Sequence, residues 1–205
     1  MIAIVDYGVN NLRSVQKALE HVGAEAVVTD DRQVIREAQG VILPGVGAFG
    51  DAMAILGRTG LDEAVLDVAA RGIPLLGICL GMQLLFDESE EMGSHRGLGI
   101  IPGKIVRIPA DLGLVVPHIG WNQLHPQREH PLLAGVMDGD YAYFVHSYYA
   151  LPEDEHIILA TTDYGLDFVS IFGQGHLFGV QFHPEKSQSV GLKLLGNFAK
   201  VVGES

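Results

Sequence analysis

The chain contains one cysteine, Cys79, with glycine two residues before it and two residues after it. The apolar run 73–76, opened by proline, predicts a buried strand, and residues 80–86 predict a helix. A sharp turn from strand to helix needs small residues at these two offsets, because side chains there would collide with the strand and the helix. The turn would present the thiol at the edge of a sheet and at a helix N-terminus, where free N–H groups favour a thiolate. Cys79 is therefore predicted to be a nucleophile.

A lone cysteine in an apolar run is otherwise most often a small buried hydrophobe. That interpretation gives no reason for Gly77 and Gly81. The turn alone does not name a reaction, because thiol hydrolases, amidotransferases and redox-sensing proteins could all use it.

A possible base follows the last predicted strand, in Phe182-His183-Pro184-Glu185. Pro184 biases His183 toward an extended backbone, and residues i and i+2 of an extended chain point the same way. His183 and Glu185 would then act as a base and the group that orients it. The alternative is a surface histidine beside a solvated glutamate. His146 is the one rival base, although its strand context is more typical of packing or ligand contact.

Residues 43–50 read L-P-G-V-G-A-F-G and match the G-x-G-x-x-G pattern of dinucleotide-binding folds. In dinucleotide-binding folds, that pattern lies at the first strand–helix turn, and an acidic residue ends the next strand. In this chain, the pattern follows the third predicted strand, and the fourth predicted strand ends in Cys79 rather than in an acidic residue. The glycines instead favour a loop that turns backbone N–H groups toward the nucleophile as an oxyanion hole. They would also let the Val46 peptide rotate into or out of that position.

Composition limits the remaining possibilities. A chain of 205 residues, 48% hydrophobic and 19% charged, predicts a single globular domain over 1–205. A net charge of −12 argues against nucleic acid and against an anionic membrane surface. No apolar run is long enough to span a bilayer, and the N-terminus enters a strand directly, so we expect a cytoplasmic protein. One cysteine and the lack of an H-E-x-x-H motif predict neither a disulfide framework nor a metal site, and no cofactor is expected.

The first half of the chain alternates predicted strands and helices, which is typical of a parallel α/β sheet. The expected strands are 2–6, 26–28, 41–43 and 73–78, and the expected helices are 12–22, 34–38 and 61–70. Functional residues of such sheets lie beyond the carboxyl ends of the strands, so residues 7–11, 44–50 and Cys79 should share one edge.

The second half has short strand-like runs with little helix between them, so antiparallel pairing should dominate. These runs are 105–108, 115–116, 141–149, 157–160, 168–172 and 177–182. An amphipathic helix over about 190–201 should close the fold. The acidic cluster 88–91 predicts a solvated loop, from which one carboxylate could hold a cationic group of a ligand.

Three motifs together resemble the class I glutamine amidotransferases: P-G-V-G at 44–47, G-I-C-L-G-M-Q at 77–83 and Q-F-H-P-E-K-S at 181–187. The resemblance extends over nearly the whole chain. It implies an α/β, flavodoxin-like fold in which a central, mostly parallel sheet carries helices on both faces and the second half is rich in antiparallel strands.

The resemblance also implies a mechanism. Cys79 would attack the side-chain amide of glutamine, His183 would protonate the departing ammonia, and Glu185 would orient His183. The backbone N–H groups of Val46 and Leu80 would hold the oxyanion. Water would then cleave the glutamyl thioester to glutamate.

By the same resemblance, five residues would bind the glutamine head group, with Glu91 facing its α-amino group. They are Gly45, Gln83, Glu91 and the backbone of Ser147 and Tyr148.

Within the family, four stretches resemble the glutaminase subunits of imidazole glycerol phosphate synthase, an enzyme of histidine biosynthesis: 5–8, 11–15, 120–122 and 143–149. This implies a heterodimer in which ammonia passes to a (β/α)₈ cyclase subunit that makes imidazole glycerol phosphate and AICAR. Asn10, Asn11, Trp121 and Asn122 would lie near the interface. Asn10 and Met92 depart from the family pattern, which usually has glycine at both positions.

Two other interpretations stay open. The glutaminase of pyridoxal phosphate synthase also has a Cys-His-Glu triad, but it should lack the Gly-Trp-Asn and Asn-Leu-Arg-Ser-Val stretches. A catalytically silent binding subunit could keep the fold, although the intact Cys79, His183 and Glu185 argue against it.

Overall fold

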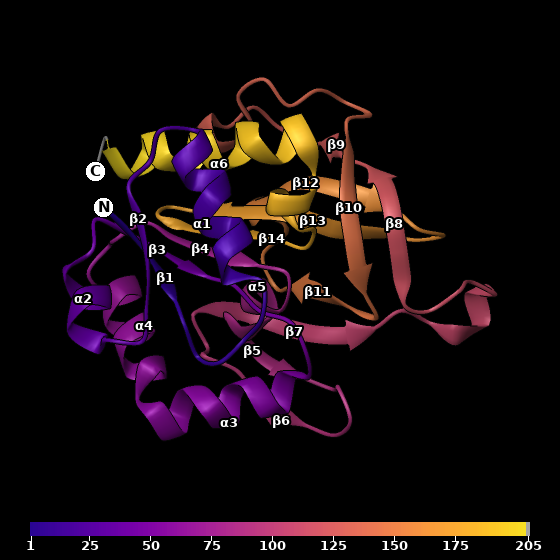
Figure 1. The fold of residues 1–205 in the computed structure, drawn as a ribbon. Helices are drawn as coiled ribbons and strands as arrows, with labels where there is room; N and C mark the ends of the chain where they lie inside the picture. The colour runs from indigo at the N-terminus through magenta and orange to yellow at the C-terminus, as the bar shows by residue number, and fades with distance from the viewer. Residues whose placement is uncertain (204–205) are drawn as a thin grey trace.

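An eight-stranded sheet lies at the centre of the computed structural model, which describes residues 1–203 (Figure 1). Five neighbouring strands are parallel, and the last three add antiparallel pairs at one edge. In spatial order they are β2 (Ala26–Thr29), β1 (Ile2–Val5), β3 (Gly40–Leu43), β4 (Leu75–Ile78), β14 (Leu177–Val180), β13 (Asp167–Gln174), β12 (Ile158–Asp163) and β9 (His125–Pro126).

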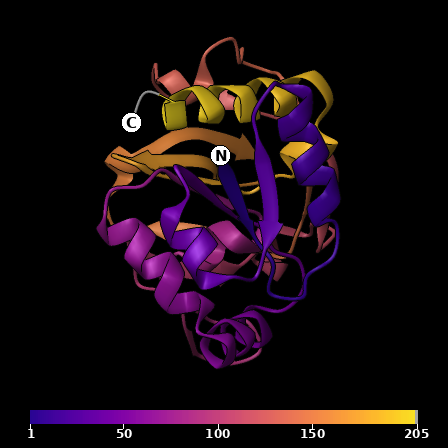
Figure 2. The same ribbon diagram turned by 60° about the vertical axis from the view of Figure 1, so that its left-hand side comes forward.

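Helices cover both faces of this sheet (Figure 2). One face packs against α1 (Leu12–His21) and α6 (Gln188–Gly203), and the other against α2 (Arg32–Glu37), α3 (Phe49–Thr59) and α4 (Leu61–Ala70). Successive side chains of β1 alternate between the two cores, as the pleat of a strand requires: Ile4 packs with α1 and α6, and Val5 with α2 to α4.

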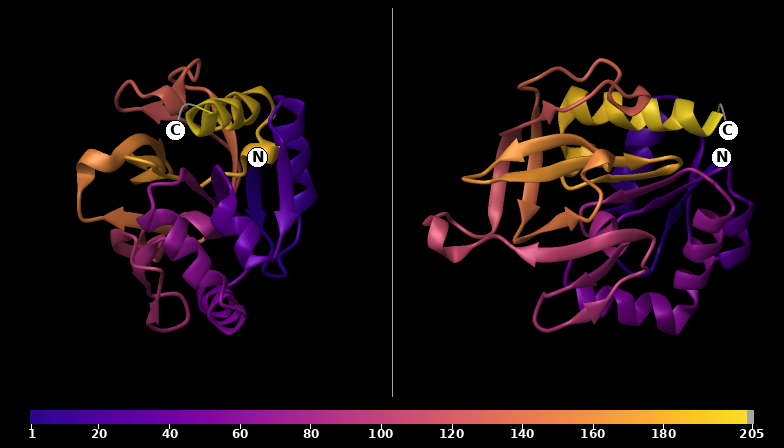
Figure 3. Two further views of the ribbon diagram at one scale, coloured as in Figure 1. Left: turned by 90° about the vertical axis from the view of Figure 1, so that its left-hand side faces the viewer. Right: turned by 180° about the vertical axis from the view of Figure 1, so that it is seen from behind.

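Two smaller sheets are inserted beside the central one. The first contains β11 (Tyr148–Pro152), β7 (Ile101–Arg107), β5 (Phe86–Ser89) and β6 (His95–Arg96). The second is an antiparallel pair, β8 (His118–Gln123) and β10 (Tyr141–His146), which stands upright at one edge of the molecule (Figure 1). The segment between β7 and β8 projects away from the body (Figure 3).

Short helices occupy the connections. They are α5 (Leu80–Leu84), η1 (Ala110–Leu112), η2 (Pro131–Leu133), η3 (Glu155–Ile157) and η4 (Pro184–Lys186). Within residues 1–203, no helix combines the length and the apolar character that crossing a bilayer would require.

The predicted fold class is confirmed: the central sheet is mostly parallel, helices lie on both faces, and the second half is rich in antiparallel strands. One helix was missed. Helix α3 contains Gly50 and Gly57, and glycine disfavours helix. Tertiary packing outweighs that cost, because Phe49, Ala52 and Leu56 are buried at helical spacing.

Four other expectations were wrong in detail. Residues 115–116 are not a strand, since β8 begins at His118. The run 141–149 divides at Ser147 into β10 and β11, which belong to different sheets. The helix expected over 80–86 ends at Leu84, and the acidic cluster then starts within β5 rather than in a loop, because buried Phe86 and Ser89 anchor that strand against β7.

Candidate functional site

Cys79 lies at the sharp turn between β4 and α5, with φ 53° and ψ −113°. A residue other than glycine at such a φ is strained, and strain of this kind is concentrated at functional sites. A Cβ added at Gly77 would lie 2.5 Å from the Cα of Met82, and one at Gly81 would overlap the carbonyl of Leu43. The two glycines are therefore required by the close approach of strand and helix. Because α5 has only five residues, its dipole supports the thiolate less than a full helix would.

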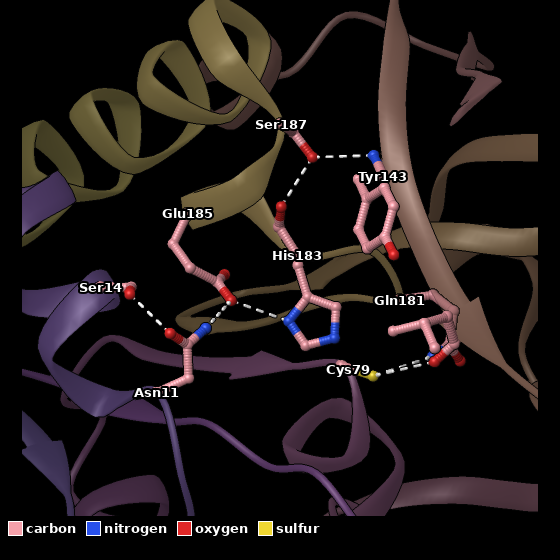
Figure 4. Close-up of polar contacts among 9 residues, drawn as sticks. Asn11, Ser14, Cys79, Tyr143, Gln181, His183, Glu185 and Ser187 are labelled. Carbon is pink, nitrogen blue, oxygen red and sulfur yellow. Dashed lines mark hydrogen bonds and ion pairs between the residues drawn. The ribbon is translucent and has the colours of Figure 1, made fainter. Parts of the chain in front are cut away.

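His183 has the expected extended backbone, with φ −96° and ψ 99°, but Glu185 lies in η4, so a turn rather than extended chain brings the two side chains together. The Nδ1 of His183 lies 2.8 Å from the Oε1 of Glu185, and the two side chains are 3% and 2% exposed. Figure 4 shows the His183 ring between Glu185 and Cys79. The Nε2 of His183 has no hydrogen-bond partner among residues 1–203, so it remains free on the side that faces the thiol.

The pKa of His183 is raised to about 10. Burial by itself lowers that pKa, but Cys79 and the carboxylate of Glu185 raise it by more. The raised pKa favours the protonated imidazolium at neutral pH, next to the sulfur of Cys79. An imidazolium in this position can give a proton to a departing amine.

Asn11 and Ser14 extend this arrangement. The Nδ2 of Asn11 donates to the same Glu185 oxygen at 3.0 Å, and the Oγ of Ser14 donates to the Oδ1 of Asn11 at 2.5 Å (Figure 4). Asn11 was predicted near a partner interface, and nothing in its sequence context indicated this contact. The structure places its amide directly against Glu185.

A cavity of about 280 Å³ lies over Cys79 and His183. Its volume suits a ligand of amino-acid size better than a nucleotide. Six of the seven residues predicted for the oxyanion hole and for substrate binding line it together: Val46, Leu80, Gln83, Glu91, Ser147 and Tyr148. The other lining residues are Gly47, Pro117, Val145 and His146.

Gly45 does not line this cavity. A Cβ there would lie 2.6 Å from the Oη of Tyr7 and 2.8 Å from the N of Gly81, so Gly45 is needed for close packing beneath the loop. Tyr7 donates to the carbonyl of Pro44 at 2.9 Å and holds the start of the same loop. Of the two glycines that flank Val46, only Gly47 has a positive φ, 107°. Of these two glycines, Gly47 alone adopts a backbone conformation that favours glycine.

Two polar side chains limit what the cavity can bind. The Nε2 of Gln83 donates at 3.0 Å to the carbonyl of Tyr148 and at 3.0 Å to the Oε1 of Gln181, so both of its N–H groups are used. Gln83 can offer a ligand only its carbonyl oxygen. One carboxylate oxygen of Glu91 accepts from the N–H of Phe49 at 2.7 Å, which leaves the other for a cationic group.

Gln181 was not among the predicted site residues. Its Nε2 lies 3.8 Å from the Sγ of Cys79, and its side chain is fully buried (Figure 4). The sequence signal was only proximity, because Gln181 precedes His183 by two positions and the chain bends at residues 181–182.

The remaining residues predicted for the interface divide into two groups. Trp121 is 46% exposed, and its ring contacts that of Tyr143 with centroids 5.9 Å apart. Asn122 points inward and donates to the carbonyl of Asp163 at 2.8 Å. Asn10 lines a small hollow beside Glu185, together with Gly45.

Comparison with known proteins defines the class. The glutamine amidotransferase class-I family model matches residues 3–201, so the chain belongs to that family. A solved glutamine amidotransferase superposes with a TM-score of 0.77 at 19% identity and covers 99% of this chain and 100% of its own. The structure of PurLQS from Thermotoga maritima gives a TM-score of 0.72 at 20% identity, with 98% and 95% covered. These likenesses show the fold.

Sequence relatives narrow the assignment. The chain is 55% identical over 201 residues to "Imidazole glycerol phosphate synthase subunit HisH" of Moorella thermoacetica, covering 98% of this chain and 95% of the relative. It is 51% identical over 205 residues to the protein of the same name from Geobacillus kaustophilus, with 98% and 97% covered. Within the class, the chain belongs to the family of imidazole glycerol phosphate synthase HisH subunits.

The part of the chain that the structure describes has no cluster of three or more His, Cys, Asp or Glu side chains that could hold a metal ion.

Proposed function

We propose that this chain is the glutaminase subunit of imidazole glycerol phosphate synthase. It hydrolyses glutamine to glutamate and ammonia, and the ammonia passes to the cyclase subunit. The observation that carries the proposal is the strained Cys79 facing the free Nε2 of a His183 that Glu185 holds at 2.8 Å, in a cavity of amino-acid size.

The reaction begins with the thiolate of Cys79, which attacks the carbonyl carbon of the glutamine side chain. Two backbone N–H groups, those of Val46 and Leu80, stabilise the oxyanion of the tetrahedral intermediate. As that intermediate collapses, the C–N bond breaks and His183 gives its Nε2 proton to the departing amine, which leaves a glutamyl thioester. Neutral His183 then takes a proton from water, whose oxygen attacks the thioester and releases glutamate.

The head group of glutamine is held on the opposite side of the cavity. The free carboxylate oxygen of Glu91 binds the α-ammonium group, and Gln83 presents a carbonyl oxygen. Backbone atoms of Ser147 and Tyr148 complete the contacts. Gly45 acts through packing beneath the loop rather than through direct contact with the substrate.

The partner is the cyclase subunit, which we expect to be a (β/α)₈ barrel that forms a heterodimer with this chain. The outer face of β8 and β10 supports this, because three large apolar side chains are exposed there: Ile119 at 60%, Trp121 at 46% and Tyr141 at 53%. An exposed apolar patch of this kind is typical of a docking surface. A reduced nucleophilic thiol fits a cytoplasmic protein.

The test replaces the nucleophile. Cys79→Ala should abolish glutamine hydrolysis by the complex with its cyclase subunit, because the attacking sulfur is lost. The synthase reaction driven by free ammonia should continue at the wild-type rate, because only the nitrogen source is removed. Glutamine-dependent turnover above a few per cent of wild type would exclude Cys79 from this role, and loss of both activities would indicate a disrupted complex.

The same assay separates the two alternatives. A silent binding subunit would leave the wild-type complex without glutamine hydrolysis. A glutaminase of pyridoxal phosphate synthase would hydrolyse glutamine without supporting imidazole glycerol phosphate formation.

Partner binding should also control the rate. Glutamine hydrolysis should be slow for the chain alone and faster by about two to three orders of magnitude with the cyclase subunit and its nucleotide ligand, if the Val46 N–H turns into the oxyanion site only in the complex. The measurement compares glutaminase turnover for the chain alone, with partner, and with partner plus ligand. A flat series would contradict this control and leave the triad unaffected.

A further inference from the structure

Two buried histidines outside the triad face each other across the β8–β10 pair. His118 and His146 are direct partners in the strand register and are 4% and 6% exposed. His146 lines the cavity over Cys79, whereas His118 lies one strand farther away. The mechanism above uses neither side chain.

Their hydrogen bonds can run in only one direction. The Nδ1 of His146 lies 2.9 Å from the carbonyl of Tyr148, and because a carbonyl only accepts, Nδ1 carries the hydrogen. The Nε2 of neutral His146 must then accept, so the Nδ1 of His118, at 3.0 Å, donates to it. The Nε2 of His118 in turn accepts from the Nδ2 of Asn122 at 3.3 Å.

The chain of hydrogen bonds continues beyond Tyr148 to the nucleophile. The same carbonyl accepts from Gln83, Gln83 also donates to Gln181, and the Nε2 of Gln181 lies 3.8 Å from the Sγ of Cys79. An unbroken polar path therefore joins Asn122, next to exposed Trp121, to the glutamine cavity.

Both rings are neutral at physiological pH, as this arrangement requires. Burial lowers the pKa of His118 to about 4. Burial also lowers the pKa of His146, to about 3; the hydrogen bond to the Tyr148 carbonyl raises this pKa, and repulsion from His118 and His183 lowers it further. A proton on His146 Nε2 would face the donor N–H of His118 and break the path.

We propose that His118 and His146 are positioning residues: they fix the carbonyl of Tyr148, and with it the glutamine-binding backbone of Ser147 and Tyr148, relative to the partner face of β8. This rests on the proposed function, because its readout is glutamine use. Movement of β8 on docking then changes how well the cavity holds glutamine.

The test variant is His118→Phe. An aromatic ring keeps the stacking of His118 on Phe144 and Tyr164, with centroids 5.2 Å and 4.0 Å away, but cannot donate to His146. In the complex, the KM for glutamine should rise by about tenfold, the usual effect of losing one buried hydrogen bond, with a smaller change in kcat. His118→Asn carries an N–H near the Nδ1 position and should keep most of the wild-type affinity.

Phe168→Leu is the matched control, since its ring packs 4.8 Å from His146 but takes no part in the hydrogen bonds. It should lower the melting temperature and leave the KM unchanged. A folded His118→Phe complex with a KM within about twofold of wild type would overturn the proposal. So would an equal rise in KM for Phe168→Leu, because packing alone would then explain the effect.

A second measurement needs no variant and decides the matter if His118→Phe does not fold. Imidazole ¹⁵N chemical shifts of the wild-type complex at neutral pH should show both rings neutral, each protonated at Nδ1. A charged ring, or a hydrogen on the Nε2 of His146, would overturn the proposal. If the wild-type complex fails to hydrolyse glutamine, the proposed function fails, and the shifts still test the hydrogen-bond path.

Discussion

The cavity has two walls that are built in different ways. The nucleophile wall consists of Val46, Gly47, Cys79 and Leu80, which follow two neighbouring parallel strands, β3 and β4. The strand wall consists of residues 145–148, at the junction of β10 and β11, which belong to two different sheets.

The nucleophile wall depends on backbone geometry, because close-packed glycines and a strained turn fix where its thiol points, and the positive φ of Gly47 sets the conformation of the loop that carries the Val46 N–H. The strand wall depends on three buried polar side chains that are far apart in the sequence, Gln83, His118 and His146. Gln83 and His146 donate to the carbonyl of Tyr148, and His118 donates to His146. The difference suggests a division of roles. Changes on the nucleophile side should affect the chemical step, and changes on the strand side should affect glutamine affinity and its control.

The largest effects should come from the triad beside the nucleophile wall. His183→Asn removes the acid for the ammonia leaving group and should lower kcat by about four orders of magnitude or more. Glu185→Gln keeps the His183 imidazole but orients it poorly. The fall in kcat should therefore be smaller than that of His183→Asn by about one to two orders of magnitude. Steady-state glutaminase kinetics of the complex would measure both. Equal defects would show that the pair acts only as a unit.

A smaller effect on the same step should follow from Asn11→Ala. This change removes one of the two hydrogen-bond donors to the Oε1 of Glu185. Because a hydrogen bond to a charged group contributes more than a neutral one, its loss should lower kcat by about tenfold. The affinity for the cyclase subunit, measured by titration, separates this effect from docking. A loss of affinity with unchanged kcat in the saturated complex would assign Asn11 to the interface instead.

The two walls should respond to pH in opposite directions. His118 and His146 have pKa values below 6.5 in the folded state, so their contribution to stability is present above pH 6.5 and is lost as the pH falls toward 4 and 3. Between pH 6.5 and pH 5, protonation of the unfolded state at His146 should lower the free energy of unfolding by roughly 1 to 2 kcal/mol. His183 has a raised pKa, so its contribution is complete below pH 6.5 and is lost as the pH rises through about 10.

Urea unfolding from pH 5 to pH 10 would measure these slopes. His118→Asn should flatten the acid limb and His183→Asn the alkaline limb, because each variant removes one of the titrating groups. Variants that leave both limbs unchanged would contradict the assignment of these slopes to the histidines.

The smallest expected effect concerns Met92, beside Glu91. Met92 has φ 55° and is 87% exposed, and glycine adopts this conformation without strain. Met92→Gly should therefore stabilise the protein by up to about 1 kcal/mol in urea unfolding and leave glutamine kinetics unchanged. Met92→Ala is the control and should give no gain, since alanine keeps the unfavourable φ. A change in KM would show that the loop also shapes the cavity.

The contrast between the walls also explains what the sequence could predict. Cys79 and its glycines lie within five consecutive residues, and His183 and Glu185 are two positions apart. Nearness in the chain therefore sufficed to pair them, although η4 rather than extended backbone joins His183 to Glu185. The contact of Asn11 with Glu185 joins residues 174 positions apart, and no periodicity indicates it.

The fold shows the same limit. Strands β1, β3 and β4 were predicted because each is a short, continuous apolar run, as a buried parallel strand requires. The division of 141–149 at Ser147 was not, because one continuous run serves two sheets and only tertiary pairing separates them. The inward direction of His118 and Asn122 depends on the same pairing.

The central claim is that Cys79 forms a covalent bond with the γ-carbonyl carbon of glutamine, and acid quenching of the complex during turnover tests it most directly. Intact-mass measurement of the quenched subunit should show a fraction carrying one glutamyl group, and peptide mapping should place that group on Cys79. Glu185→Gln should leave the site of attachment unchanged, and Cys79→Ala should carry no adduct. A glutamyl group on another residue, or full glutamine turnover by Cys79→Ala, would contradict the account.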